Sequence, residues 1–136
     1  MIYLLDTNVI IALLGDKQPA VRDGMIRARR AGNTIALSSI SLHELWYGVA
    51  KSGRPGPNTE ALTRLLATGF EILPFDDGDA EAAGNVRGTL AGAGQPIGPY
   101  DVLIAGQAIR RNATLVTANE KEFRRVPGLN WENWAK

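Results

Sequence analysis

The chain has 136 residues, which suits one domain with a hydrophobic core of its own. Its composition, 45% hydrophobic and 21% charged, is that of an ordinary soluble globular protein, and a net charge of +1 gives no general sign of a nucleic-acid binder. The absence of cysteine excludes disulfides, thiolate catalysis and cysteine zinc sites. No apolar run reaches membrane-spanning length, and no signal peptide is visible. We therefore expect a soluble, cytoplasmic protein that forms a single domain over residues 1–136.

Strand-like and helix-like segments alternate along the chain. Short apolar runs predict strands, and apolar residues at helical spacing predict helices. The expected strands are 1–5, 34–38, 70–75 and 114–117, with a short fifth in 126–131. The expected helices are 9–14, 20–30, 39–51, 58–68, 76–93, 100–111 and 119–123, with residues 52–57 as a loop. This order predicts an α/β fold with a central, mainly parallel sheet of four to five strands flanked by helices.

The first strand is continuously apolar and ends in a carboxylate, Asp6. A strand without polar alternation is typical of a parallel sheet that is covered on both faces. Asp6 is therefore expected at the carboxyl end of a central strand, the edge at which open α/β sheets bind ligands.

Four polar residues stand near the starts of expected helices: Asp6, Glu44, Asp101 and Asn119. Each has a purely structural interpretation. Asp6 can cap a helix, Glu44 completes an S-x-x-E capping box that begins at Ser41, and the acid Asp101 suits a first helical turn.

Taken together, the four residues favour a shared site. If the strands form one parallel sheet, the side chains face one crevice, where neighbouring carboxylates repel one another unless a cation is present. Mg²⁺ is typically held by one or two carboxylates, water and substrate phosphate, an arrangement that suits phosphodiester hydrolysis. Asp6 and Asp101 are the expected direct ligands, with Glu44 acting through water or as a base.

Other polar residues of the chain either support this site or have a structural explanation. Thr7 and Thr117 can orient the carboxylates, although a buried threonine at a strand end has an equal structural explanation. The acids 76, 77 and 79 are interpreted as a capped, solvated helix start, and His43 as a partly exposed helix residue. Two groups of basic residues could contact phosphates, but solvated helix faces explain them at least as well. The first group is Arg22, Arg27, Arg29 and Arg30, and the second is Arg110, Arg111, Lys121, Arg124 and Arg125. No nucleotide-binding glycine motif opens a helix.

Four blocks of the sequence, in this order and spacing, resemble PIN-domain ribonucleases, and more closely the VapC toxins of type II toxin–antitoxin systems. They are LLDTN at 4–8, ISLHEL at 40–45, PIGPYDVLIA at 96–105 and LVTAN at 115–119, and the ending EFRRVPGL at 122–129 with the final tryptophan fits the same group. The resemblance spans essentially the whole chain.

The resemblance implies a PIN fold and a Mg²⁺- or Mn²⁺-dependent endoribonuclease. By match of motif, Asp6, Glu44 and Asp101 are its acidic residues, and Asn119 stands where the family often has Asp. It further implies an RNA substrate, a VapB-type antitoxin whose C-terminal segment lies over the acidic site, a homodimer, and a toxin–antitoxin hetero-oligomer.

Two other functions fit the same sequence. One is a PIN-domain nuclease that processes RNA without being a toxin, and the other is a PIN module that binds RNA or a partner without cleaving. A phosphoacceptor receiver domain also gathers acids at a sheet edge, but it requires a lysine just after a late strand, and residues 115–119 contain none.

Overall fold

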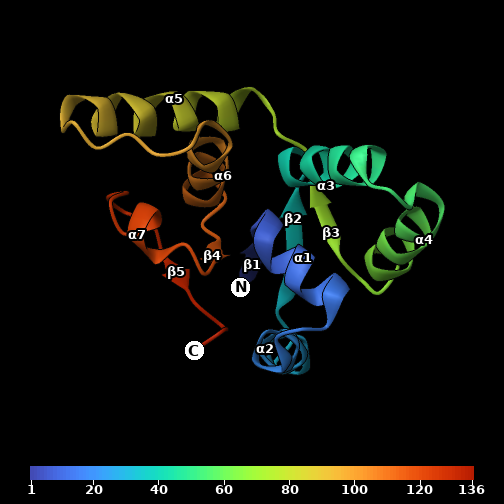
Figure 1. Cartoon of the computed structure of the whole chain (residues 1–136). Helices are drawn as coiled ribbons and strands as arrows, with labels where there is room; N and C mark the ends of the chain where they lie inside the picture. The colour runs from blue at the N-terminus through green and yellow to red at the C-terminus, as the bar shows by residue number, and fades with distance from the viewer.

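The computed structural model describes all 136 residues as a sheet between two layers of helices (Figure 1). The strands are β1 (Ile2–Leu5), β2 (Thr34–Ser38), β3 (Glu71–Leu73), β4 (Thr114–Val116) and β5 (Trp131–Glu132). The helices are α1 (Thr7–Gly15), α2 (Pro19–Arg30), α3 (Ser39–Lys51), α4 (Pro55–Leu66), α5 (Asp77–Gly92), α6 (Pro99–Arg110) and α7 (Glu120–Phe123). None of these helices is both long and apolar enough to cross a bilayer.

All five strands are parallel and lie in the order β3-β2-β1-β4-β5. The expected α/β fold with a parallel sheet is therefore confirmed. The chain builds outward from β1 first on one side and then on the other, so the strand order reverses between β1 and β4. In doubly wound sheets, ligands bind beside such a reversal, outside the carboxyl ends of the strands.

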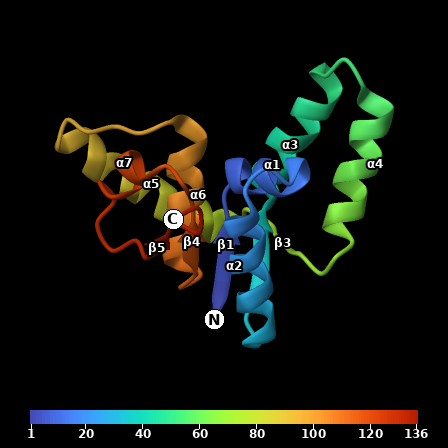
Figure 2. The ribbon, with the colours of Figure 1, turned by 60° about the horizontal axis from the view of Figure 1, so that its bottom comes forward.

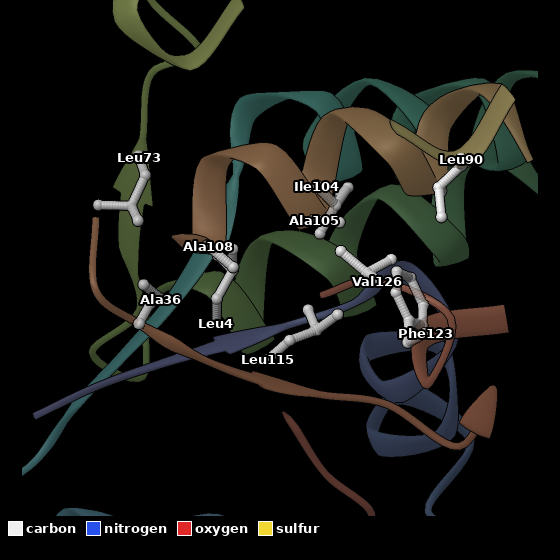
Figure 3. Close-up of a cluster of buried hydrophobic side chains, with 11 residues drawn as sticks. Leu4, Ala36, Leu73, Leu90, Ile104, Ala105, Ala108, Leu115, Phe123 and Val126 are labelled. Carbon is white, nitrogen blue, oxygen red and sulfur yellow. The ribbon is translucent and has the colours of Figure 1, made fainter. Parts of the chain in front are cut away.

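Successive side chains of the central strands point to opposite faces of the sheet, so the core forms two clusters, one on each face. Leu4 and Leu115 belong to the cluster beneath α5 and α6, which Figure 3 shows with Ile104, Ala105 and Ala108 directed at the strands. Their neighbours Leu5 and Val116 belong to the cluster under α1, α2, α3 and α4. Both faces of β1 are therefore covered, which explains its unbroken apolar sequence.

Two expected elements differ clearly from the observed ones, and one expected helix cap is wrong. The segment expected to be a loop at 52–57 contains the start of α4, because Pro55 takes the first helical position, where its fixed φ suits a helix and its missing N–H costs nothing. The third strand is shorter than expected and ends before Pro74, which has no N–H for a ladder. The Ser41–Glu44 capping box is wrong, since α3 already begins at Ser39 with Ser38 as its cap.

The acids at the start of α5 differ from expectation in one respect. Asp76 and Asp79 form the expected capping box, but Asp79 is fully buried and not solvated. Its carboxylate accepts hydrogen bonds from Arg110 at 3.0 Å, Arg111 at 3.0 Å and 3.2 Å, and Gln107 at 3.0 Å. Burial alone would raise the pKa of Asp79, but these bonds outweigh it and hold that pKa far below its usual range. Arg110 and Arg111 are thus structural ion-pair partners.

Candidate active site

The candidate site lies at the carboxyl end of β1, where the chain turns directly into α1. In Figure 2 this is the end of the sheet away from the N-terminus, with α1 and α3 on one side and α6 on the other. Asp6 is the N-cap of α1, and its Oδ1 accepts the Val9 N–H at 2.9 Å. The backbone N–H of Asp6 in turn donates to the Val116 carbonyl at 3.1 Å, which ties the residue to β4. The expected capping role is therefore present, and it fixes the carboxylate at the reversal point of the sheet.

Glu44 and Asp101 reach the same place from two helices. Glu44 lies in the second turn of α3, and the Thr7 hydroxyl donates to its Oε1 at 2.8 Å. Asp101 lies in the first turn of α6, after Pro99 at the helix start. All three carboxylates line one hollow of about 400 Å³, within the size range of small-ligand sites.

The carboxylates affect one another's ionisation. Burial raises the pKa of Asp6, and the charge of Glu44 raises it further, while hydrogen bonds from the Thr117 hydroxyl and the Val9 N–H oppose this. Burial, a shared hydrogen bond with Glu122 and the charges of Glu122, Asp6 and Glu44 raise the pKa of Asp101 to about 7. The site therefore holds more negative charge than its own groups neutralise.

Glu122 is a site residue that the sequence interpretation missed. Its hydrogen bond with Asp101 lowers the pKa of Glu122, and contacts from the Asn119 amide and the Gly98 N–H lower it further. Two acids that share a proton titrate together, so the raised pKa of Asp101 and the lowered pKa of Glu122 describe the pair. The missed signal was the three-residue spacing from Asn119 to Glu122 on α7, which places both side chains on one helix face.

Asn119 takes part in the site indirectly. Its Nδ2 donates to Glu122 Oε2 at 2.8 Å, and its backbone N–H donates to Thr117 Oγ1 at 2.9 Å. The amide makes no hydrogen bond to Asp6, Glu44 or Asp101, and it does not line the hollow. Asn119 thus positions Glu122, while Thr117 connects this segment to Asp6.

The possible metal-binding atoms of the hollow are those that a hard divalent cation prefers. All are carboxylate oxygens, and burial first and the neighbouring acids second raise the pKa values of Asp6 and Asp101. No three histidine or acidic side chains are arranged as a ready-made cage for a metal ion. Carboxylate oxygens are the ligands that hard divalent cations prefer, with water and substrate oxygens completing the coordination.

The remaining lining of the hollow includes three aromatic rings and one lysine. His43 is exposed, and its ring centroid lies 5.9 Å from that of Tyr100. No serine or cysteine completes a nucleophilic triad with it among the lining residues. Lys51 is the only basic residue in the lining.

Comparison with known proteins agrees with this architecture. The PIN domain family model matches residues 3–129. The chain is 43% identical to Ribonuclease VapC2 of Rickettsia felis over the whole of both chains. It is 36% identical over 133 residues to the tRNA(fMet)-specific endonuclease VapC of Shigella flexneri, covering 98% of each.

Solved structures give the same result in three dimensions. The chain matches the structure of VapBC2 from Rickettsia felis bound to a promoter DNA fragment with a TM-score of 0.93 and 41% identity, covering 98% of this chain and 99% of that chain. DNA-bound VapBC from Salmonella typhimurium matches with a TM-score of 0.90 at 36% identity, covering 98% of both chains. The chain therefore belongs to the PIN-domain family, among the VapC ribonucleases.

Proposed function

We propose that the protein is a Mg²⁺-dependent endoribonuclease toxin that hydrolyses RNA phosphodiester bonds at the acidic hollow and is neutralised by a VapB-type antitoxin. The observation that carries this proposal is the convergence of Asp6, Glu44 and Asp101 at the reversal point of the sheet, with Glu122 behind them. A mutually repelling acid set in an open hollow is costly for a fold and is explained by a cation-dependent reaction.

Asp6 and Asp101 would hold the metal directly, and Glu44 would do so through water. The bound ion supplies an activated water and neutralises charge on the scissile phosphate, and Mn²⁺ can replace Mg²⁺ in such an oxygen site. Three contacts fix the geometry: the Val9 N–H on Asp6, the Thr117 hydroxyl on Asp6, and the Thr7 hydroxyl on Glu44. Glu44 would also help to accept a proton from the attacking water.

The test is RNA cleavage by purified protein, measured with Mg²⁺ and with EDTA. We expect Asp6→Asn and Asp101→Asn to lower the rate at least about 100-fold, since each removes a charge that the reaction uses. Asp77→Asn is the matched control, an exposed acid in the first turn of α5. Transfer RNA is a suitable first substrate because the Shigella flexneri relative is a tRNA(fMet)-specific endonuclease. Full activity of either site variant, or undiminished cleavage in EDTA, would contradict the proposal.

The antitoxin partnership is supported by the VapBC complexes among the similar structures. A second hollow of about 600 Å³, lined largely by α1, α3 and α4, adjoins the acidic one and shares Asn8, Ile11, Glu44 and Gly48 with it. A segment seated there would lie beside the carboxylates, and a homodimer would carry two such sites.

Expression in a bacterial host tests the toxin role. We expect growth arrest by the wild-type chain, none by Asp6→Asn, and relief when a small DNA-binding protein encoded beside it is co-expressed. Normal growth together with RNA cleavage in vitro would instead identify an RNA-processing nuclease. RNA binding without cleavage under any Mg²⁺ or Mn²⁺ condition would identify a binding module.

A further inference from the structure

The hollow that contains the acids has a second wall with a different chemistry. Tyr47 and His43 project from α3 and Tyr100 from the start of α6, and all three line the hollow together with Lys51. Tyr100 is the residue directly before Asp101. An aromatic wall therefore stands immediately beside the carboxylates.

The tyrosine rings contribute little to the core. Tyr47 is 61% exposed and Tyr100 is 44% exposed, and neither belongs to the core clusters. Exposed aromatic side chains that gather at a concave site are more often used for binding than for packing. The His43 ring lies against Tyr100, and the Lys51 Nζ lies 5.0 Å from the Tyr47 ring centroid, so both tyrosines have a neighbour that restricts their orientation.

The charge of the site makes such a wall useful for RNA. Asp6, Glu44 and Asp101 repel phosphate, and Lys51 is the one basic side chain in the lining. Backbone electrostatics therefore cannot supply most of the affinity at this point, whereas base stacking on an aromatic ring is independent of charge. Unpaired RNA bases are commonly splayed out and stacked on tyrosine.

We propose that Tyr100 and Tyr47 form a stacking platform for the unpaired bases that flank the scissile phosphate, with Lys51 contacting an adjacent phosphate. The platform holds the backbone so that the scissile bond lies over the carboxylates. Because every base has a π-face, this wall selects for unpaired nucleotides and not for a particular base. The inference rests on the proposed ribonuclease function, and its test separates binding from cleavage.

The experiment uses the full-length protein and an RNA hairpin whose loop carries one 2-aminopurine, a base whose fluorescence is quenched by stacking. Tyr100→Ala and Tyr47→Ala should each weaken RNA binding and slow single-turnover cleavage by about 5- to 150-fold, the range for loss of one stacked base. Tyr100→Phe and Tyr47→Phe keep the ring and should retain wild-type binding, cleavage and quenching. Tyr100→Leu keeps bulk without an aromatic face and should behave like the alanine variant.

Trp46→Ala is the matched control, because Trp46 is 38% exposed on the same helix as Tyr47 but does not line the hollow. It should leave binding and cleavage unchanged. Wild-type quenching by the alanine variants, equal loss in the phenylalanine variants, or loss of antitoxin binding with RNA binding intact would overturn the platform. If the wild-type protein quenches the probe without cutting RNA, the ribonuclease proposal fails and only the stacking of bases on the two tyrosines stands. If the wild-type protein cuts RNA and the alanine variants cut it equally well, the platform fails while the ribonuclease proposal stands.

Discussion

At the scale of single residues, the pairing of Asp101 with Glu122 determines how the site responds to pH. Burial and Glu122 together raise the pKa of Asp101 to about 7, well above its ordinary 3.8. Between these two values the folded, metal-free protein holds a proton that the unfolded chain has released. The contribution of Asp101 to stability is therefore greatest at the low-pH end of this window and is lost as pH rises through 7. A bound cation would remove this penalty by competing with the proton.

Glu122→Gln tests this pairing. We expect the pKa of Asp101 to fall, because the variant removes a negative charge, yet to stay above 3.8, because burial is the largest cause of the shift. Carbon-13 NMR titration of the carboxyl groups in EDTA measures the change directly. An unchanged Asp101 titration would show that Glu122 does not interact with it in solution.

At the scale of elements, the packing of α5 against α6 depends on one glycine. A Cβ added at Gly106 would overlap the backbone of Ala83, and only a shift of one helix could relieve that overlap. Overpacking of this kind costs about 1–3 kcal/mol or more. The two helices approach so closely because the position has no side chain.

Gly106→Ala and Gly84→Ala should therefore change stability in opposite directions. A Cβ at Gly84, on the exposed side of α5, meets nothing within 4 Å, so alanine there should stabilise the helix by roughly 0.5–1 kcal/mol. Thermal unfolding should show a lowered Tm for Gly106→Ala and a Tm raised by a few degrees for Gly84→Ala. Equal effects of the two substitutions would contradict the close helix crossing.

The buried Asp79 joins the same helices through charge. Asp79→Asn should destabilise the protein by about 1–3 kcal/mol, because it weakens the hydrogen bonds of a buried group, while Arg110 and Arg111 keep 40% and 25% exposure to solvent that limits the cost. The pKa of Asp79 lies far below its ordinary value, so its contribution is complete above about pH 4 and is lost only as pH falls below that. Acid unfolding of the wild type and the variant should therefore converge at low pH. Parallel acid-unfolding curves would show that Asp79 is not the titrating group.

At the scale of the whole molecule, Mg²⁺ should stabilise the fold. A ligand that binds only the folded state adds about 2.7 kcal/mol at a concentration 100 times its Kd, so the Tm should rise with added Mg²⁺. Asp101→Asn should abolish most of this rise and, in EDTA above pH 7, should itself be more stable than the wild type, since it removes a buried charge. Differential scanning fluorimetry measures both effects, and the same metal response in wild type and variant would place the cation elsewhere.

The sequence by itself determined the succession of strands and helices along the chain and the parallel sheet. It also determined the candidate site residues Asp6, Glu44, Asp101 and Asn119, through the sequence blocks that contain them. These follow from local periodicity, from covered strands that must be apolar, and from cap residues that mark helix starts. Local pattern failed at Pro55, because a proline can either interrupt a helix or occupy its first position. Pro55 begins α4, in a segment that was expected to be a loop.

Only the tertiary structure decided which charges meet. From the sequence, Asp79 is expected to be part of a solvated helix start. In the structure, the end of α6 brings Arg110 and Arg111 to it, from 31 and 32 residues later in the chain. Glu122 became a site residue because β4 pairs with β1 and brings α7 against the start of α6, and the aromatic wall exists because α3 and α6 flank the same hollow. Burial and distance between remote segments set these interactions, and both depend on how the layers pack and not on any local spacing.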